Sequence, residues 1–241
     1  MKGYKSVRAV YHAIVPEPLR DRLHQWSPRQ VRALKRQAVA AFEKDAGHDD
    51  IYDSDYFTKF VDPTMCMSSQ IIVRSIVQAF DVTKVVDVGC GTGILLEELK
   101  RANVDGLGLE LADAGIAKCI ERGVSVRKHD IERDPPPPVR ADVVISTEVA
   151  EHLPADCADR FVALLAGIAD IVVLTAATPG QGGTDHVNEQ PNEYWIDKFR
   201  AHGRWFDEAL SMQWRSRWEA EGAANCFWSS VMVFRSGAKP A

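Results

Sequence analysis

The chain has 241 residues, of which 46% are hydrophobic, and a formal net charge of −5, values that fit a globular protein with one domain and an appendage. No apolar run approaches the roughly 18 residues that a membrane-spanning helix needs. The five cysteines are odd in number and lack the C-x-x-C spacing of metal sites, so we expect no disulfide framework and a cytoplasmic location.

The first 40 residues are basic, with nine Lys and Arg side chains against two acids, so the rest of the chain is acidic. Two short helices are expected in residues 1–45; Pro16 and Pro18 end the first, and Ser27-Pro28 begins the second. This arm could bind an anionic partner, or it could be a solvated helix face that pairs with the acidic body. The acidic body argues against nucleic acid as the partner. We expect residues 1–67 to form a helical extension.

Residues 68–241 alternate between helix and strand patterns. The expected helices are 68–80, a helix from Ile94, 112–121, 158–169, 194–202 and 208–219, and the expected strands are 84–88, 104–109, 124–128, 142–146, 171–175 and 228–234. Buried strands that alternate with amphipathic helices predict an α/β, doubly wound, Rossmann-like domain with a mostly parallel sheet. Ligands of such sheets bind at the carboxyl ends of the strands.

A glycine-rich turn, Gly89-Cys90-Gly91-Thr92-Gly93, follows the first strand and precedes a helix. Glycines allow a sharp bend and let a ligand approach the backbone, and the helix N-terminus behind them offers unpaired N–H groups. The spacing G-x-G-x-G differs from the dinucleotide fingerprint, and no Lys-Ser or Lys-Thr follows as in a P-loop. Asp87 lies inside the strand just before the turn.

The pattern D-x-G-x-G-x-G from Asp87 to Gly93 resembles motif I of the class I S-adenosylmethionine-dependent methyltransferases. The resemblance implies a methyltransferase with a seven-stranded sheet and S-adenosylmethionine as cofactor. It also implies that Gly89, Cys90, Gly91 and Gly93 pack against the amino-acid end of the cofactor, and that Asp87 helps to hold its ammonium group.

Further cofactor contacts are expected where the next strands end. Glu110 lies 23 positions after Asp87, and a carboxylate at the end of the second strand can accept hydrogen bonds from both ribose hydroxyls. Alternatively, it is an acid at the N-terminus of the next helix. By resemblance, Asp130 binds the adenine amino group and Ile131 supplies a backbone N–H. The remaining expected cofactor residues are Leu111, Thr147 and Glu148.

A second group of candidates follows the fourth strand. Glu148, Glu151 and His152 are spaced to lie on one side of a helical turn, and His186 on the next ligand-side loop could join them. Two carboxylates and two imidazoles could bind Mg²⁺ or Mn²⁺. The E-x-x-E-H pattern resembles the metal-dependent small-RNA 2′-O-methyltransferases and the ubiquinone-pathway O-methyltransferases. In metal-free methyltransferases the same residues make structural hydrogen bonds, and that alternative stays open.

Without a metal, His186 is the expected general base, because its unperturbed pKa of about 6.5 suits that role. Asp185 could be the base instead, or could orient His186, and Glu148 is a further catalytic candidate. The expected reaction is O-methylation of a small metabolite, sugar or natural-product scaffold. The alternatives are an RNA ribose 2′-O-methyltransferase and a cofactor-binding protein without turnover.

Overall fold

The computed structural model describes residues 48–239, so the two expected helices of the basic arm lie outside the described part. The chain divides into two units between Asp53 and Ser54. The described part of the first unit contains the short helix α4 (His48–Ile51). Its turn is closed by the backbone N–H of Tyr52, which donates to the carbonyl oxygen of His48 at 2.9 Å.

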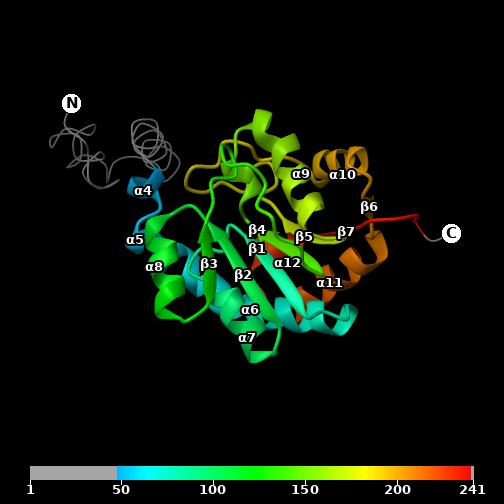
Figure 1. Cartoon of the computed structure of the whole chain (residues 1–241). Coiled ribbons are helices and arrows are strands. Elements are labelled where there is room, and N and C mark those ends of the chain that lie inside the picture. Colours follow the sequence, from blue (N-terminus) through cyan, green and yellow to red (C-terminus); the bar gives the residue numbers. More distant parts are fainter. Residues whose placement is uncertain (1–47, 240–241) are drawn as a thin grey trace, which may run out of the picture. The chain divides into compact units, whose positions relative to one another are not determined.

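The second unit holds the α/β domain (Figure 1). Its helices and strands, in chain order, are α5 (Ser54–Tyr56), the π-helix η2 (Phe57–Val61), α6 (Asp62–Ala79), β1 (Lys84–Val88), α7 (Ile94–Arg101), β2 (Asp105–Glu110), α8 (Asp113–Glu121), β3 (Ser125–Lys128), β4 (Val143–Thr147), the 3₁₀ helices η3 (Ala150–His152) and η4 (Ala155–Cys157), α9 (Ala158–Ile168), β5 (Ile171–Thr175), α10 (Asn192–Ala201), β6 (Trp205–Phe206), α11 (Glu208–Ala220), α12 (Asn225–Ser230) and β7 (Met232–Arg235).

The strands form one seven-stranded sheet in the order β3-β2-β1-β4-β5-β7-β6. The first five strands in this order are parallel, while β7 runs antiparallel to both β5 and β6. The strand order reverses between β1 and β4, because the chain leaves β1 towards β2 on one side and returns to β4 on the other. A ligand crevice is expected at this switch point, outside the carboxyl ends of the strands.

Helices cover both faces of the sheet, with α9 and α10 on one face and α6, α7 and α11 on the other (Figure 1). Successive strand residues therefore face different cores. Val85 joins the core on the α6 side, and the next residue, Val86, joins the core on the α9 side. This burial on both faces explains why the central strands are almost continuously apolar.

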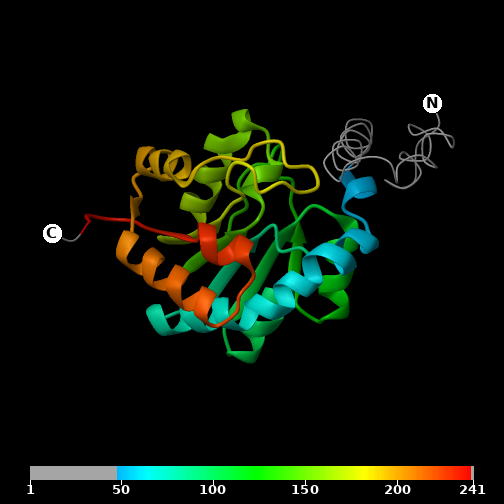
Figure 2. The same ribbon diagram turned by 180° about the vertical axis from the view of Figure 1, so that it is seen from behind.

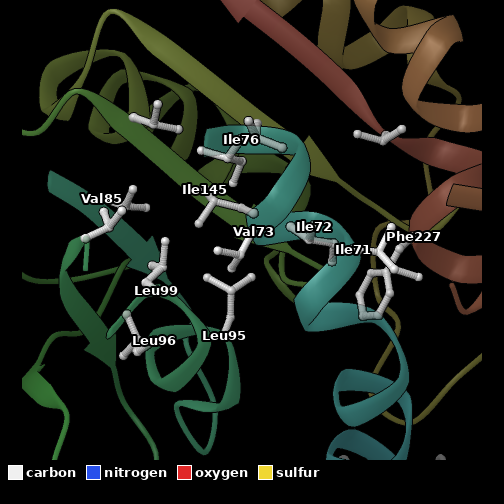
Figure 3. Packing of buried hydrophobic residues seen from close by; sticks show 14 of the residues in the cluster. Ile71, Ile72, Val73, Ile76, Val85, Leu95, Leu96, Leu99, Ile145 and Phe227 are labelled. Atoms are coloured by element: carbon white, nitrogen blue, oxygen red, sulfur yellow. The ribbon is translucent and has the colours of Figure 1, made fainter. Parts of the chain in front are cut away.

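The core on the α6 side packs aliphatic residues of α6 and α7 against the sheet, with Phe227 of α12 beside Ile71 (Figure 3). Helices α6 and α11 lie next to each other (Figure 2). A buried hydrogen bond joins them, in which the indole N–H of Trp218 donates to Ser75 Oγ at 2.8 Å. In the other core, Phe161 of α9 meets Trp195 of α10 edge to face at 6.2 Å between ring centroids.

The predicted α/β fold with a mostly parallel seven-stranded sheet is confirmed, and the strands expected at 84–88 and 171–175 are β1 and β5. The helix expected at 68–80 begins earlier, at Asp62, with a proline in its first turn, where its missing N–H costs nothing. The domain boundary expected between residues 67 and 68 consequently falls inside α6.

The last strand was expected to start at Trp228, and this is wrong, because residues Asn225–Ser230 form helix α12 and β7 begins only at Met232. The helix buries Phe227 in the core, and within it Ser230 Oγ donates to the carbonyl oxygen of Cys226 at 2.8 Å. Burial of the ring thus outweighs the strand pattern of the local sequence. Across residues 48–239, each helix is too short or too polar to cross a membrane.

Candidate functional site

The glycine turn between β1 and α7 has left-handed backbone at Gly89 (φ 76°), Gly91 (φ 53°) and Gly93 (φ 77°). At two of these positions, close packing also leaves no space for a side chain. A Cβ on Gly89 would lie 2.4 Å from Val149 Cγ2, and a Cβ on Gly93 would lie 2.9 Å from the Cys119 sulfur. The turn is thus fixed both by its backbone conformation and by the segments that press against it.

Asp87 lies at the carboxyl end of β1 and is 2% exposed. Its Oδ1 is buried and makes no hydrogen bond within the described part of the chain. Burial, with a smaller contribution from the nearby Glu110, raises the pKa of Asp87 to about 8. A buried carboxyl group whose oxygen lacks a hydrogen bond is costly to ionise, and a nearby positive charge would offset that cost.

Glu110, at the end of β2, binds the glycine turn directly. Its Oε2 accepts a hydrogen bond from the Gly91 N–H at 2.7 Å. Its Oε1 accepts from the backbone N–H groups of Leu111 and Ala112, at 2.7 and 2.8 Å, just before α8. The alternative role, an acid before the next helix, is therefore present in the structure, and the expected ribose contact would use the remaining lone pairs of the same carboxylate.

The side chain of Cys90 points away from the ligand side of the turn. Its sulfur lies 3.9 Å from the Cys119 sulfur in α8. It also packs against β2, where a Cβ on Gly108 would come within 2.4 Å of it. Any contact of Cys90 with a cofactor would therefore use its backbone.

The residues expected at the adenine end form a turn after β3. Asp130 Oδ1 accepts from the backbone N–H groups of Glu132 at 2.9 Å and Arg133 at 3.2 Å. The carbonyl oxygen of Ile131 accepts from Arg160 Nε at 2.8 Å. These contacts fix the turn at the same edge of the sheet as Glu110, and the adenine role of Asp130 and Ile131 stays a prediction.

The segment after β4 differs from the helical turn expected there. Glu148 has a left-handed backbone (φ 54°), and the following turn, η3, is a 3₁₀ helix. The Glu148 carboxylate accepts hydrogen bonds from Thr175 Oγ1 at 2.9 Å and Gln181 Nε2 at 2.8 Å. Burial raises the pKa of Glu148 to about 7, although these two hydrogen bonds oppose the shift.

Three of the four expected metal ligands come together. One potential ligand atom from each of Glu151, His152 and His186 lies within 4.8 Å of the others. Glu148 is not part of this group, because its carboxylate turns towards Thr175 and Gln181.

Glu151 has no exposed surface, and neither of its carboxylate oxygens makes a hydrogen bond within the described residues. Burial and the neighbouring Glu148 raise the pKa of Glu151 well above its usual range, against a smaller opposing effect of nearby backbone N–H groups. The imidazoles of His152 and His186 meet edge to face, with ring centroids 4.9 Å apart. His186 Nε2 lies 4.0 Å from Glu151 Oε1.

The loop that carries His186 contains a residue that the sequence did not single out, Glu189. Its carboxylate lies 2.9 Å from His186 Nδ1, at hydrogen-bond distance, and accepts from the backbone N–H groups of Gly180 and Gly182, at 2.8 and 2.6 Å. Burial alone would raise the pKa of Glu189, but these hydrogen bonds hold it below its usual value. Asp185, the alternative base, has a left-handed backbone (φ 57°), and its carbonyl oxygen lies 3.2 Å from His152 Nδ1.

The segment just before α6 covers the glycine turn. Phe57 is buried, and a Cβ on Gly91 would touch its ring at 3.5 Å. Thr92 Oγ1 donates to Asp62 Oδ1 at 2.6 Å, which ties α6 to the turn. Burial and, in decreasing order, the carboxylates of Glu151, Asp185, Glu110 and Glu148 raise the pKa of Tyr56 to about 12. Tyr56 is therefore near enough to both Glu110 and Glu151 for their charges to affect its hydroxyl group.

Known proteins resemble this chain in sequence and in fold. A family model described as methionine biosynthesis protein MetW matches residues 69–154. Ubiquinone biosynthesis O-methyltransferase of Methylococcus capsulatus is 41% identical over 78 residues, which are 30% of this chain and 33% of that protein. The chain thus covers about a third of the length of the curated relatives that it matches.

Solved structures match most of the chain in fold. The sugar N-methyltransferase KedS8 from Streptoalloteichus superposes with a TM-score of 0.59 over 79% of this chain and 94% of its own, at 16% identity. The chain therefore has the fold of the class I S-adenosylmethionine-dependent methyltransferases. Magnesium protoporphyrin IX methyltransferase from Synechocystis, solved with bound SAH, superposes with a TM-score of 0.54 over 76% of this chain and 98% of its own, at 16% identity.

Proposed function

We propose that this chain transfers a methyl group from S-adenosylmethionine to a hydroxyl group of a small organic molecule. The observation that carries the proposal is the buried carboxyl group of Asp87 beside the left-handed glycine turn. By the class I resemblance, its Oδ1, which makes no hydrogen bond within the described residues, would face the cofactor's ammonium group. A cation at this point would offset the cost of burying the carboxylate.

The rest of the cofactor site fits the same ligand. The turn brings left-handed glycine backbone to the carboxyl end of β1, and Glu110 holds that turn against β2. The residues proposed to hold the cofactor are Asp87, Gly89, Cys90, Gly91, Gly93, Glu110, Leu111, Asp130, Ile131, Thr147 and Glu148. When bound, S-adenosylmethionine supplies an electrophilic methyl group.

The chain's own residues align the acceptor and take up its proton. Alignment of two reactants can lower a barrier by about 7–11 kcal/mol, so one modest base is sufficient. His186 is our candidate base, because its Nε2 lies on the cluster side of the loop, 4.0 Å from Glu151. Glu148, with a pKa of about 7, and Asp185, whose carbonyl oxygen meets His152, are the other candidates.

We also infer that Glu151, His152 and His186 bind a divalent cation such as Mg²⁺ or Mn²⁺. The Glu151 oxygens support this, because they are buried, make no hydrogen bond within the described residues, and would be stabilised by a metal. The cation would lower the pKa of a coordinated hydroxyl group, and His186 would then be a ligand instead of the base. Removal of metal with EDTA and the variant Glu151→Ala should both abolish activity that Mn²⁺ stimulates. Full activity in EDTA would exclude the metal.

The acceptor class rests on the named relatives, which are O-methyltransferases of ubiquinone biosynthesis. Small metabolites with hydroxyl groups, sugars among them, are therefore the first acceptors to test, followed by a small RNA, each with a labelled methyl donor. Titration calorimetry with S-adenosylmethionine tests the cofactor site. Asp87→Asn should weaken binding. The control Asp105→Asn should not, because Asp105 is an exposed acid at the start of β2, whereas Glu110 lies at its end. Absence of binding by the wild-type chain would refute the proposal.

A further inference from the structure

Glu189 belongs to the loop between β5 and α10, and its side chain accepts hydrogen bonds from the backbone of that same loop. Its Oε2 accepts from the Gly180 N–H at 2.8 Å, and its Oε1 accepts from the Gly182 N–H at 2.6 Å. Oε1 also lies 2.9 Å from His186 Nδ1. One carboxylate therefore fixes both the path of the glycine-rich backbone and the edge of the imidazole ring.

These contacts determine which nitrogen of His186 carries the proton. A carboxylate that accepts hydrogen bonds from two backbone N–H groups, those of Gly180 and Gly182, is held as the anion, and an anionic carboxylate can only accept hydrogen bonds. Nδ1 of His186 must then be the donor. The neutral ring consequently keeps its lone pair on Nε2.

The position of the ring is constrained from its other side by Gly183. A Cβ at this residue would lie 2.2 Å from His186 Nε2 and 2.7 Å from Cδ2, so the ring occupies the space that a side chain would fill. Nε2 then lies 4.0 Å from Glu151 Oε1.

We propose that Glu189 is a positioning residue that holds His186 as the Nδ1–H tautomer and presents the Nε2 lone pair to the Glu151 cluster. The catalytic meaning of this arrangement rests on the proposed function. Both roles considered for His186, proton acceptor and metal ligand, require a lone pair on Nε2. Glu189 would serve either role without touching the acceptor.

The direct test is long-range ¹H–¹⁵N NMR of the histidine rings in the full-length chain at a pH where His186 is neutral, with the signals assigned by His186→Gln. The wild type and the control Glu193→Gln, which changes an exposed acid in the first turn of α10, should show the Nδ1–H tautomer. Glu189→Ala should shift His186 towards the Nε2–H tautomer. Glu189→Met keeps the side-chain length without the acceptor, so it should give the same shift and serves if the alanine variant does not fold.

Kinetics and calorimetry separate this proposal from the proposed function. Loss of Glu189 should lower kcat about 10–100-fold, the usual effect of removing a histidine's orienting partner, while the affinity for S-adenosylhomocysteine stays within about twofold. A wild-type Nε2–H tautomer, or an Nδ1–H tautomer that persists in both Glu189 variants, would overturn the positioning role. The expected tautomer shift in a chain that binds no cofactor would support Glu189 and refute the proposed function alone.

Discussion

Binding of the cofactor's ammonium group should release a proton from Asp87. The pKa of about 8 that burial gives this carboxyl group leaves it about nine-tenths protonated at pH 7. An opposite charge within about 4–6 Å lowers a carboxyl pKa by roughly 1–3 units. In the complex, Asp87 would then be protonated in between about one-hundredth and one-half of the molecules at pH 7. Binding at this pH should therefore release roughly 0.4–0.9 proton per ligand.

Calorimetry with S-adenosylhomocysteine at pH 7, in two buffers with different ionisation enthalpies, measures this number directly. Because the ammonium group favours the ionised form of Asp87, the affinity should also rise between pH 6 and pH 8. Asp87→Asn should bind more weakly and lose this proton release, whereas Asp105→Asn should behave as the wild type.

The comparison between wild type and Asp87→Asn isolates this carboxyl group from other groups that titrate near neutral pH, such as Glu148. Tight binding with the same proton release in both proteins would refute the assignment of Asp87 to the ammonium group. Tight wild-type binding with no proton release would show that no cation reaches this carboxyl group.

Two further predictions concern stability and use urea unfolding. Gly89→Ala should lower the free energy of unfolding in two ways: a left-handed backbone costs a residue with a Cβ roughly 1–2 kcal/mol, and overlap with Val149 costs about 1–3 kcal/mol more. Gly203→Ala is the control, because Gly203 has the same backbone conformation but open space around it, and should show the first cost alone. Equal losses of stability in the two variants would contradict the packing argument. Ser75→Ala should lower the free energy of unfolding by about 1–3 kcal/mol, because it leaves the buried indole N–H of Trp218 without its acceptor, and an unchanged midpoint would show that another acceptor takes over.

Much of the cofactor side of the site could be predicted from the sequence, because its signals are local. An apolar strand, three glycines and a following helix lie within one short stretch from Lys84 to Arg101, and the structure has them as β1, the turn and α7. Strand and helix alternation then placed Glu110 and Asp130 at the same edge of the sheet as Asp87, since parallel strands end together.

The catalytic side was predicted less well, because it depends on where distant segments meet. Glu148 was expected to share a helical face with Glu151, but its left-handed backbone turns it towards Thr175 of the neighbouring strand. Glu189 carried no sequence signal, since its role depends on hydrogen bonds within an irregular loop.

The amino-acid sequence by itself determined the parallel α/β domain and the bend that follows its first strand, because neighbouring residues set backbone conformation and the period of burial. Only the tertiary structure decided that Asp87 Oδ1 is buried without a hydrogen bond among the described residues, that Glu151 meets His152 and His186, and that β7 runs antiparallel between β5 and β6. Burial, pairing and proton affinity depend on contacts between segments far apart in the chain, and these exist only once the sheet and its loops have assembled.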